Sequence, residues 1–246
     1  GYTNNYYFSH MLNCIYDCKY CFLQGMFASA NYLIFVNYKD FFNPITKILK
    51  NSKEKVCFFS GYDCDSLAFE KVTNFVENFL NFFEKIENGI LEIRTKSPNI
   101  QVFKKRKPLD NVIVAYSLNP NEIIKEFEPK TSNLKIRLKC LKILQQMNWK
   151  IGLRFDPIIN VDGNFNLYKH FFKIIFSELD PKKIHSVTLG KFRMPRRFYN
   201  KFINLRQEDS FVFNKLNNSD ENNINKLHEY EFELLKHLEP NKIFSN

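Results

Sequence analysis

The sequence predicts an α/β fold, a partial (β/α)6 barrel that resembles part of a TIM barrel. Short β-rich runs alternate with stretches of helical period along most of the chain. Strands separated by helices form right-handed βαβ units, and such units build a parallel sheet. Polar motifs follow several of the runs directly, and barrel folds place their chemistry on the loops at the carboxyl ends of the strands. We therefore expect the functional site at that edge of the sheet.

Six short runs are the predicted strands of this barrel. They are rich in β-branched and aromatic residues, which favour extended backbone, and polar or turn-forming residues separate each run from the next segment. The six runs lie at residues 6–10, 56–61, 91–95, 112–117, 150–155 and 185–190.

Two of the intervening helices have recognisable limits. From Ser66 to Ile86, large apolar residues recur near helical spacing, which predicts one helix with its aromatic face in the core. Ser132 is placed to act as the N-cap of a second helix, which continues to about Met147.

The alternating pattern weakens after about residue 205. The segment that follows predicts a polar loop, and residues Asn222 to Leu238 then predict a closing amphipathic helix. We find no internal repeat and expect a single domain. In it, residues 1–205 form the partial barrel, and residues 206–246 form the polar loop and the closing helix.

Composition limits the class of protein. Of the 246 residues, 44% are hydrophobic and 25% are charged, which is typical of a globular chain and excludes disorder as the main state. No apolar run approaches the roughly 20 residues of a membrane-spanning helix, and no secretion signal is recognisable, so we expect a cytoplasmic protein without membrane contacts. A formal net charge of +10 fits a polyanionic partner, but the codon bias of an AT-rich genome would produce the same excess of lysine.

Three of the six cysteines, Cys14, Cys18 and Cys21, fall within eight residues in the spacing CxxxCxxC. Such a group more often binds metal than forms disulfides when no secretion signal is present. An iron-sulfur cubane usually takes four thiolates, so three close thiolates leave one iron open. Zinc is the alternative, but structural zinc sites generally have a second CxxC pair, which this sequence lacks. We expect a 4Fe-4S cluster on these three cysteines.

The cysteine segment resembles the signature of the radical S-adenosylmethionine (SAM) superfamily, in which an aromatic residue precedes the last cysteine, as Tyr20 does here. Later segments resemble the spore photoproduct lyase family in the same order and at matching strand ends. FEPKTSNLKIRL is the most specific of them, because a generic barrel has no reason to share it. The resemblance spans about residues 10 to 198 and rests on CKYCFLQ at 18–24, SGYDCDSLA at 60–68, RTKS at 94–97, AYSLNP at 115–120, FEPKTSNLKIRL at 127–138 and LRFDPII at 153–159.

This resemblance implies a barrel of the radical SAM type that binds a 4Fe-4S cluster and SAM and receives its electron from a donor such as flavodoxin or ferredoxin. Hydroxyl and carboxylate groups suit the ribose and amino group of SAM, and a lysine suits its carboxylate. Taken singly, each serine has the alternative of a helix cap or a local backbone partner, and the lysine that of a solvated charge. The implied cofactor contacts are Tyr20, Phe22, Asp65, Ser66, Lys96, Ser117 and Asp156.

The resemblance also implies a reaction. In the family, a 5′-deoxyadenosyl radical takes a hydrogen atom from spore photoproduct, a thymine dimer in DNA, after which the methylene bridge breaks and a cysteine returns a hydrogen atom. Here Asp63 occupies the position of that cysteine and Cys64 follows it, while Phe22 replaces a tyrosine that often follows the third cluster cysteine. We expect a carbon-carbon lyase in which Cys64 substitutes as the donor and Tyr20 takes part in catalysis. The alternative is that Cys64 is a small buried residue.

Two basic runs, at residues 104–107 and 191–202, bear on a DNA partner. The second run mixes arginines with aromatic residues, and charges that follow phosphates beside rings that stack on bases are typical of nucleic-acid grooves. A lesion inside a duplex must also be extruded before an enzyme site can reach it. We expect Arg193, Arg196 and Arg197 to bind DNA, with a solvated helix start as the alternative, and we interpret the first run as a solvated turn.

The remaining thiols and imidazoles predict little chemistry. Cys57 in a strand and Cys140 in a helix are expected to be packing residues, and the five histidines show no ligand spacing, with His10 set apart by its nearness to the cysteine segment. Two rival functions stay open. One is a radical SAM enzyme of the same branch that acts on another nucleic-acid lesion, on RNA or on a peptide. The other is a non-catalytic iron-sulfur or zinc protein that binds nucleic acid.

Overall fold

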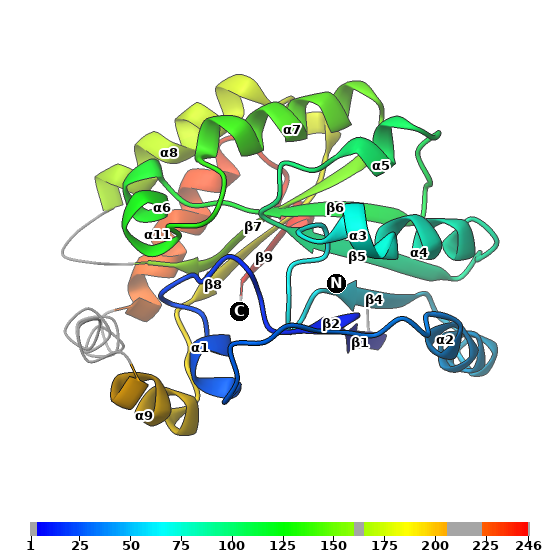
Figure 1. The fold of residues 1–246 in the computed structure, drawn as a ribbon. Helices are drawn as coiled ribbons and strands as arrows, with labels where there is room; N and C mark the ends of the chain where they lie inside the picture. The colour runs from blue at the N-terminus through cyan, green and yellow to red at the C-terminus, as the bar shows by residue number, and fades with distance from the viewer. Residues whose placement is uncertain (1–3, 160–164, 206–222, 246) are drawn as a thin grey trace.

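A parallel sheet of seven strands, in the order β1-β4-β5-β6-β7-β8-β9, forms the frame of the protein. The computed structural model describes residues 4–159, 165–205 and 223–245. The sheet curls, and the longer helices pack around its outer face, which confirms the predicted partial barrel (Figure 1). A small antiparallel pair, β2 (Met11–Leu12) and β3 (Leu33–Ile34), lies next to this sheet.

All six predicted strands are present in the sheet. Each neighbouring pair is parallel, so the carboxyl ends of the strands meet at one edge. The sequence does not predict the seventh strand, β9, because its three residues are too few to show a pattern. The strands are β1 (Asn4–Phe8), β4 (Val56–Ser60), β5 (Gly89–Thr95), β6 (Val112–Ser117), β7 (Lys150–Ile158), β8 (Ile184–Lys191) and β9 (Ile243–Ser245).

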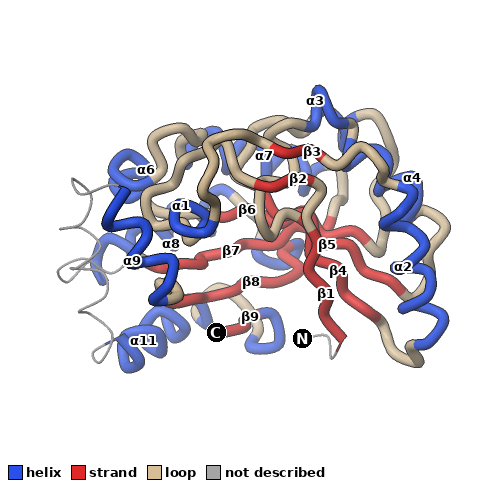
Figure 2. Tube along the Cα trace, turned by 60° about the horizontal axis from the view of Figure 1, so that its bottom comes forward, coloured by secondary structure: helices blue, strands red, loops and turns tan. Residues whose placement is uncertain are grey.

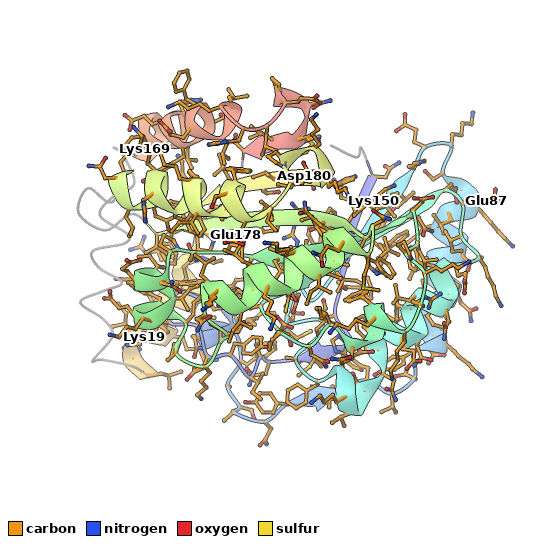
Figure 3. All side chains as sticks on the ribbon, turned by 90° about the horizontal axis from the view of Figure 1, so that it is seen from above. Lys19, Glu87, Lys150, Lys169, Glu178 and Asp180 are labelled. Atoms are coloured by element: carbon orange, nitrogen blue, oxygen red, sulfur yellow. The ribbon has the colours of Figure 1, made fainter. Side chains whose placement is uncertain are left out.

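The helices cover the sheet through apolar faces, and side chains fill the space between the two layers (Figure 3). Where neighbouring helices meet at the surface, charges pair: Glu178, labelled in Figure 3, lies 3.1 Å from Lys142. The helices are α1 (Leu23–Met26), α2 (Lys39–Asn51), α3 (Glu70–Thr73), α4 (Phe75–Phe83), α5 (Gln101–Lys104), α6 (Asn121–Phe127), α7 (Leu134–Gln146), α8 (Phe165–Glu178), α9 (Arg196–Leu205) and α11 (Asn223–Leu235), with 3-10 turns at Pro181–Lys183 and Pro240–Lys242.

The single helix predicted over residues 66–86 is wrong, because the segment forms two helices. Asn74 takes left-handed backbone, with φ 48° and ψ 30°, and separates α3 from α4. Asparagine is one of the few residues that tolerate this conformation. The carboxylate of Glu70 then accepts hydrogen bonds from the amides of Val76 at 2.8 Å and Glu77 at 3.0 Å, and so caps α4. The aromatic face of α4 is buried, as expected.

The N-cap of α7 lies one residue after the predicted one. Oδ1 of Asn133 accepts a hydrogen bond from the amide of Ile136 at 3.0 Å, so Asn133 and not Ser132 caps the helix. Ser132 instead donates its hydroxyl hydrogen to the carbonyl of Lys96 at 2.8 Å. Both residue types are good caps, so a contact with the distant end of β5 decides between them.

The predicted closing helix is present as α11, which packs against α8 and is followed by β9. The polar loop predicted before it falls at residues 206–222, outside the described residues. Within the described ranges, no helix combines the length and the apolar character that crossing a membrane requires.

Charged side chains fill part of the barrel interior. Glu92 and Arg94 occupy the face of β5 opposite its apolar core residues, as the two-residue period of a strand requires. Arg154 of β7 bonds the carboxylate of Glu92 through Nη2 at 2.6 Å and Nε at 3.0 Å, and Nε of Arg94 bonds it at 2.8 Å. Although burial alone would raise the pKa of Glu92, the two arginines lower it to about 2. The interior therefore holds a permanently charged network.

We expect Glu92→Gln to lower the free energy of unfolding by about 3 kcal/mol at neutral pH, because it leaves Arg154 buried without its counter-charge. The pKa of Glu92 is depressed in the folded protein, so its contribution is complete above its ordinary value of 4.5 and is lost as the pH falls toward 2. Denaturant unfolding from pH 7 down to pH 3 measures the difference, which should narrow in acid. Glu87→Gln, a change at an exposed residue, is the matched control. If the difference in unfolding free energy between wild type and Glu92→Gln did not change with pH, the role given to Glu92 would be contradicted.

Candidate functional site

A cavity of about 660 Å³ opens at the carboxyl ends of the strands. Its wall is built by the loop between β2 and α1, by residues at the ends of β4, β5, β6 and β7, and by the segment from β8 into α9. At this edge α1 and α9 pack side by side (Figure 2). The parallel sheet thus gathers loops that are far apart in the sequence, at the edge where the motifs predict a site.

The three clustered cysteines line this cavity on the cysteine loop, residues 13–22. Asn13 has a positive φ of 76°, and its Oδ1 accepts a hydrogen bond from the amide of Cys14 at 2.9 Å. The amide of Lys19, a residue labelled in Figure 3, donates to the carbonyl of Phe127 at 2.8 Å. These contacts tie the loop to the end of α6 and turn its thiols toward the cavity.

The donor set fits an iron-sulfur cluster. Cys14, Cys18 and Cys21 are free thiols on one wall of the cavity. In the part of the chain that the structure describes, no three His, Cys, Asp or Glu side chains converge on a single ion, but the cysteines of a cubane bind separate irons and need no such convergence. Burial, reinforced by Asp65, raises the pKa of Cys14 to about 12, and burial also raises those of Cys18 and Cys21. Cluster binding therefore has to displace the thiol protons.

Tyr20, the aromatic residue before the last cysteine, is anchored by a buried ion pair that we call the brace, Glu128 and Arg137. The hydroxyl of Tyr20 donates to Glu128, whose carboxylate also pairs with Arg137. Both side chains of the brace are fully buried, and Asn119 and Thr131 donate further hydrogen bonds to Glu128 at 3.1 and 3.2 Å. Burial alone would raise the pKa of Glu128, but Arg137 lowers it. The satisfied carboxylate thereby fixes the ring of Tyr20.

The segment that carries the brace also positions two strand ends. Nη1 of Arg137 donates to the carbonyl of Ser117 at 2.9 Å, at the end of β6. The hydroxyl of Ser132 donates to the carbonyl of Lys96 at 2.8 Å, just after β5. Residues 127–138, the most specific segment of the family resemblance, therefore hold the backbone around the cysteine loop.

Lys96 places a buried ammonium group at the cavity. Its Nζ lies 5.8 Å from the centroid of the Tyr20 ring, within the range of a cation-π contact. Burial alone would lower the pKa of Lys96, but Cys18 and Glu128 raise it, so the amine stays charged. A fixed cation beside three thiols suits an anionic ligand such as a carboxylate.

Asp65 and Ser66, which follow β4, take largely structural positions. Oδ1 of Asp65 accepts hydrogen bonds from two amides of the following turn, each at 2.9 Å, and Oδ2 accepts one from the amide of Lys96 at 2.6 Å. Asp65 therefore positions the backbone of Lys96 and also borders the cavity. Ser66 is fully buried, shares a hydrogen bond with Ser60 at 2.7 Å and is not among the residues that border the cavity.

Three more predicted contacts border the cavity from different elements: Phe22 before α1, Ser117 at the end of β6 and Asp156 within β7. The carboxylate of Asp156 lies against Gly190 of β8, where a Cβ atom would overlap it. The structure thus brings these three residues to the same space as Tyr20 and Lys96, and their contact with a cofactor stays a prediction.

The loop after β4 turns Cys64, and not Asp63, toward the cavity. The amide of Asp63 donates to the hydroxyl of Ser9 at 2.8 Å, and burial raises the pKa of its carboxyl group. Sγ of Cys64 lies 3.6 Å from Nδ1 of His10, a fully buried ring that stacks on Phe75 with centroids 3.7 Å apart. Burial raises the pKa of Cys64 and lowers that of His10 to about 3, so both groups are neutral.

The basic run after β8 lies beside the cysteine loop. α9 packs on α1, and Gly25 permits the contact because a Cβ atom there would overlap the backbone of Phe198. Arg193 borders the cavity, whereas Arg196 and Arg197 are exposed at the start of α9. Only the first of the three predicted DNA contacts therefore faces the cavity itself.

Other cavity residues escape prediction from the sequence. Arg94 borders the cavity, while Glu128 and Arg137 form the brace, and all three lie inside segments that carry the family resemblance. The available signal for Arg94 was a charged residue in a largely apolar strand. Tyr7 and Tyr62 also border the cavity, but tyrosine is common in strands and loops, so the sequence does not set them apart.

A model of the spore photoproduct lyase family matches residues 3–237 of this chain. The chain belongs to the spore photoproduct lyase family. The spore photoproduct lyase of Geobacillus sp. (strain Y412MC61) is 24% identical over 177 residues, which cover 71% of this chain and 52% of that protein. The spore photoproduct lyase of Bacillus subtilis (strain 168) has the same identity and coverage. The chain thus spans about half the length of the curated relatives it matches.

Solved structures share the fold. Spore photoproduct lyase complexed with dinucleoside spore photoproduct has a TM-score of 0.72 at 19% identity, covering 79% of this chain and 58% of that chain. A spore photoproduct lyase mutant with bound AdoMet and dinucleoside spore photoproduct has a TM-score of 0.72 at 20% identity, covering 80% of this chain and 59% of that chain. Streptococcus suis SuiB bound to S-adenosylmethionine has a TM-score of 0.60 at 12% identity, covering 89% of this chain and 49% of that chain. The partial barrel and the family resemblance are confirmed.

We expect Cys14→Ala to prevent assembly of a stable 4Fe-4S cluster, because each of the three thiolates holds a different iron. Anaerobic reconstitution followed by iron and sulfide analysis and by EPR of the reduced protein measures this. Cys140→Ala is the matched control, since that thiol lies in α7 and contacts the carbonyl of Pro98 at 3.6 Å; it should retain the cluster. A complete cluster signal in Cys14→Ala would remove Cys14 from the ligand set.

Proposed function

We propose that this chain is a radical SAM enzyme of the spore photoproduct lyase type, which cleaves the thymine dimer of spore photoproduct in DNA. The observation that carries the proposal is one cavity in which three free cysteines meet Tyr20, Lys96 and Ser117, all positioned by residues 127–138. Family membership supports it, as does a relative whose structure holds AdoMet and dinucleoside spore photoproduct.

The clustered cysteines would hold a 4Fe-4S cluster, with SAM beside it. When bound, the cluster and SAM together supply a 5′-deoxyadenosyl radical, which removes a hydrogen atom from the substrate. The ammonium group of Lys96 suits the SAM carboxylate, while Ser117 and Asp156 offer a hydroxyl and a carboxylate to its ribose and amino group. A reduced flavodoxin or ferredoxin is the kind of protein that would donate the electron.

Cys64 is the proposed hydrogen-atom donor. It borders the cavity, and burial raises its pKa and keeps its sulfur protonated, which hydrogen-atom transfer requires. In the step, the S–H bond of Cys64 breaks and a C–H bond forms at the thymine radical, so no net charge moves. Cys64 is left as a thiyl radical, which one electron from the reductant and one proton from solvent convert back to the thiol.

Tyr20 serves the reaction as a positioning residue. Its hydroxyl is buried against Glu128, where it cannot exchange a hydrogen atom with a substrate in the cavity. Phe22 provides no hydroxyl at the position where relatives often have a tyrosine. A relay through a phenol would therefore need a different tyrosine of the cavity wall.

A second function is favoured by one observation, the aspartate at the position of the family's donor cysteine. In that case the chain is a radical SAM enzyme of the same branch that acts on another lesion, on RNA or on a peptide. Cys64 then has no donor role, although the cluster and the SAM contacts are unchanged.

Turnover separates these functions. The reconstituted protein is reduced with dithionite and incubated with SAM and an oligonucleotide that contains spore photoproduct, and thymine and 5′-deoxyadenosine are followed by chromatography. We expect both products. 5′-Deoxyadenosine without thymine would establish the second function, and the absence of both would favour a binding protein over an enzyme.

We expect Cys64→Ala to release less thymine, with less deuterium at its methyl group in D2O, because the thymine radical no longer has an exchangeable S–H donor in the cavity. In D2O the wild-type thiol exchanges to S–D before turnover and delivers deuterium to thymine. Dithionite is the sole reductant, because an added thiol would exchange to S–D as well and could replace Cys64. Cys57→Ala, a buried change in β4, is the control and should behave as wild type. Equal deuterium content in Cys64→Ala and wild type would exclude Cys64 as the donor.

A further inference from the structure

Five aromatic rings form a continuous strip along one wall of the cavity. Tyr7 stacks on Phe59 with ring centroids 5.0 Å apart and meets Tyr62 at 5.4 Å. Phe22 lies 5.7 Å from Tyr62 and 6.2 Å from Phe198, on which it stacks. All five residues border the cavity. The aromatic strip therefore runs from the end of β4, past the cysteine loop, to α9.

The strip differs from the aromatic packing of the core. Phe75, Phe79 and Phe83 of α4 are fully buried, whereas Tyr7 is 54% exposed and Tyr62 is 53% exposed. Burying such rings would be favourable, at roughly 25 cal/mol for each Å² of apolar surface removed from water. Exposed rings in mutual contact along a cavity are the arrangement that planar, aromatic ligands occupy by stacking.

Cations accompany the strip. The guanidinium carbon of Arg94 lies 5.0 Å from the centroid of Phe59, and its side chain remains 33% exposed although Nε is bound to Glu92. Lys191 and Arg193 border the same cavity from the end of β8 and the segment after it. Positive charge therefore contacts the strip at Phe59 and borders the same cavity from β8 and the segment after it.

We infer that the aromatic strip is a stacking platform for the bases of a single-stranded or extruded segment of DNA, with Arg94, Lys191 and Arg193 on its phosphates. Every base has a flat face, so rings bind a strand without regard to sequence, while cations follow the backbone. The inference rests on the proposed function, for which a lesion must leave the duplex, and it names the surface that receives the extruded strand. Because the strip passes Phe22, it leads that strand to the cysteine loop.

The test is binding of a fluorescein-labelled oligothymidine to the reconstituted protein, followed by anisotropy without reductant. We expect Tyr7→Ala combined with Tyr62→Ala to weaken binding by about 5- to 150-fold, the range for loss of stacking on one base. The plot of log affinity against log salt should keep its slope, because no charge is removed. Arg193→Ala should instead lower that slope by about 0.7, the value for one phosphate of a single strand.

Two controls separate stacking from other causes. Tyr7→Phe combined with Tyr62→Phe keeps both rings and should bind as wild type. Tyr32→Ala removes an exposed ring that contacts Phe69 outside the cavity wall, and it should have no effect. Thermal unfolding of each variant shows whether the fold is retained, and the Phe variant tests the inference even if the Ala variant does not fold.

Three outcomes would overturn the inference: unchanged oligonucleotide affinity in the Ala variant, an equal loss in the Phe variant, or a loss of SAM affinity in place of oligonucleotide affinity. The last would mean that the strip holds the adenine of SAM. None of these outcomes bears on thymine release, which is measured with reductant and SAM. If thymine forms but the Ala variant keeps its oligonucleotide affinity, the stacking inference fails and the proposed lyase function stands. If the Ala variant loses affinity but no thymine forms, the lyase function fails and the stacking inference stands.

Discussion

The buried ion pair between Glu128 and Arg137 is the interaction on which the cavity depends. Two charges removed from water are tolerated only if they are paired and their remaining hydrogen-bonding positions are filled. Filling them draws in the hydroxyl of Tyr20, the amide of Asn119 and the carbonyl of Ser117. One electrostatic unit therefore joins the cysteine loop, the end of β6 and α7. A change that moves one of these elements would alter the hydrogen bonds of the other two.

A second charged network lies inside the barrel, on strands β5 and β7. A closed barrel fills its interior with layers of apolar side chains, whereas here Glu92, Arg154 and Arg94 occupy the space between β5 and β7. Arg94 links the network to the cavity, since it bonds Glu92 on one side and faces Phe59 on the other. The cavity is consequently bordered by a cation, Arg94, whose bond to Glu92 holds it in place.

Two positions of the cavity depart from what the family resemblance implies. Asp63 and Phe22 occupy the positions to which the family resemblance assigns a cysteine and often a tyrosine. The loop after β4 turns the neighbouring Cys64 toward the cavity. The chain spans about half the length of the curated relatives it matches.

Local sequence was sufficient for the six main strands, the cysteine cluster and the position of the site, because strand period and CxxxCxxC spacing depend on neighbouring residues alone. Other features depend on contacts between distant segments, which leave no local pattern. Tyr20 meets Glu128 across 108 residues, and the choice between Ser132 and Asn133 as a cap depends on the end of β5. Whether Asp63 or Cys64 faces the cavity is likewise decided by how the loop after β4 packs on His10, which only the tertiary structure determines.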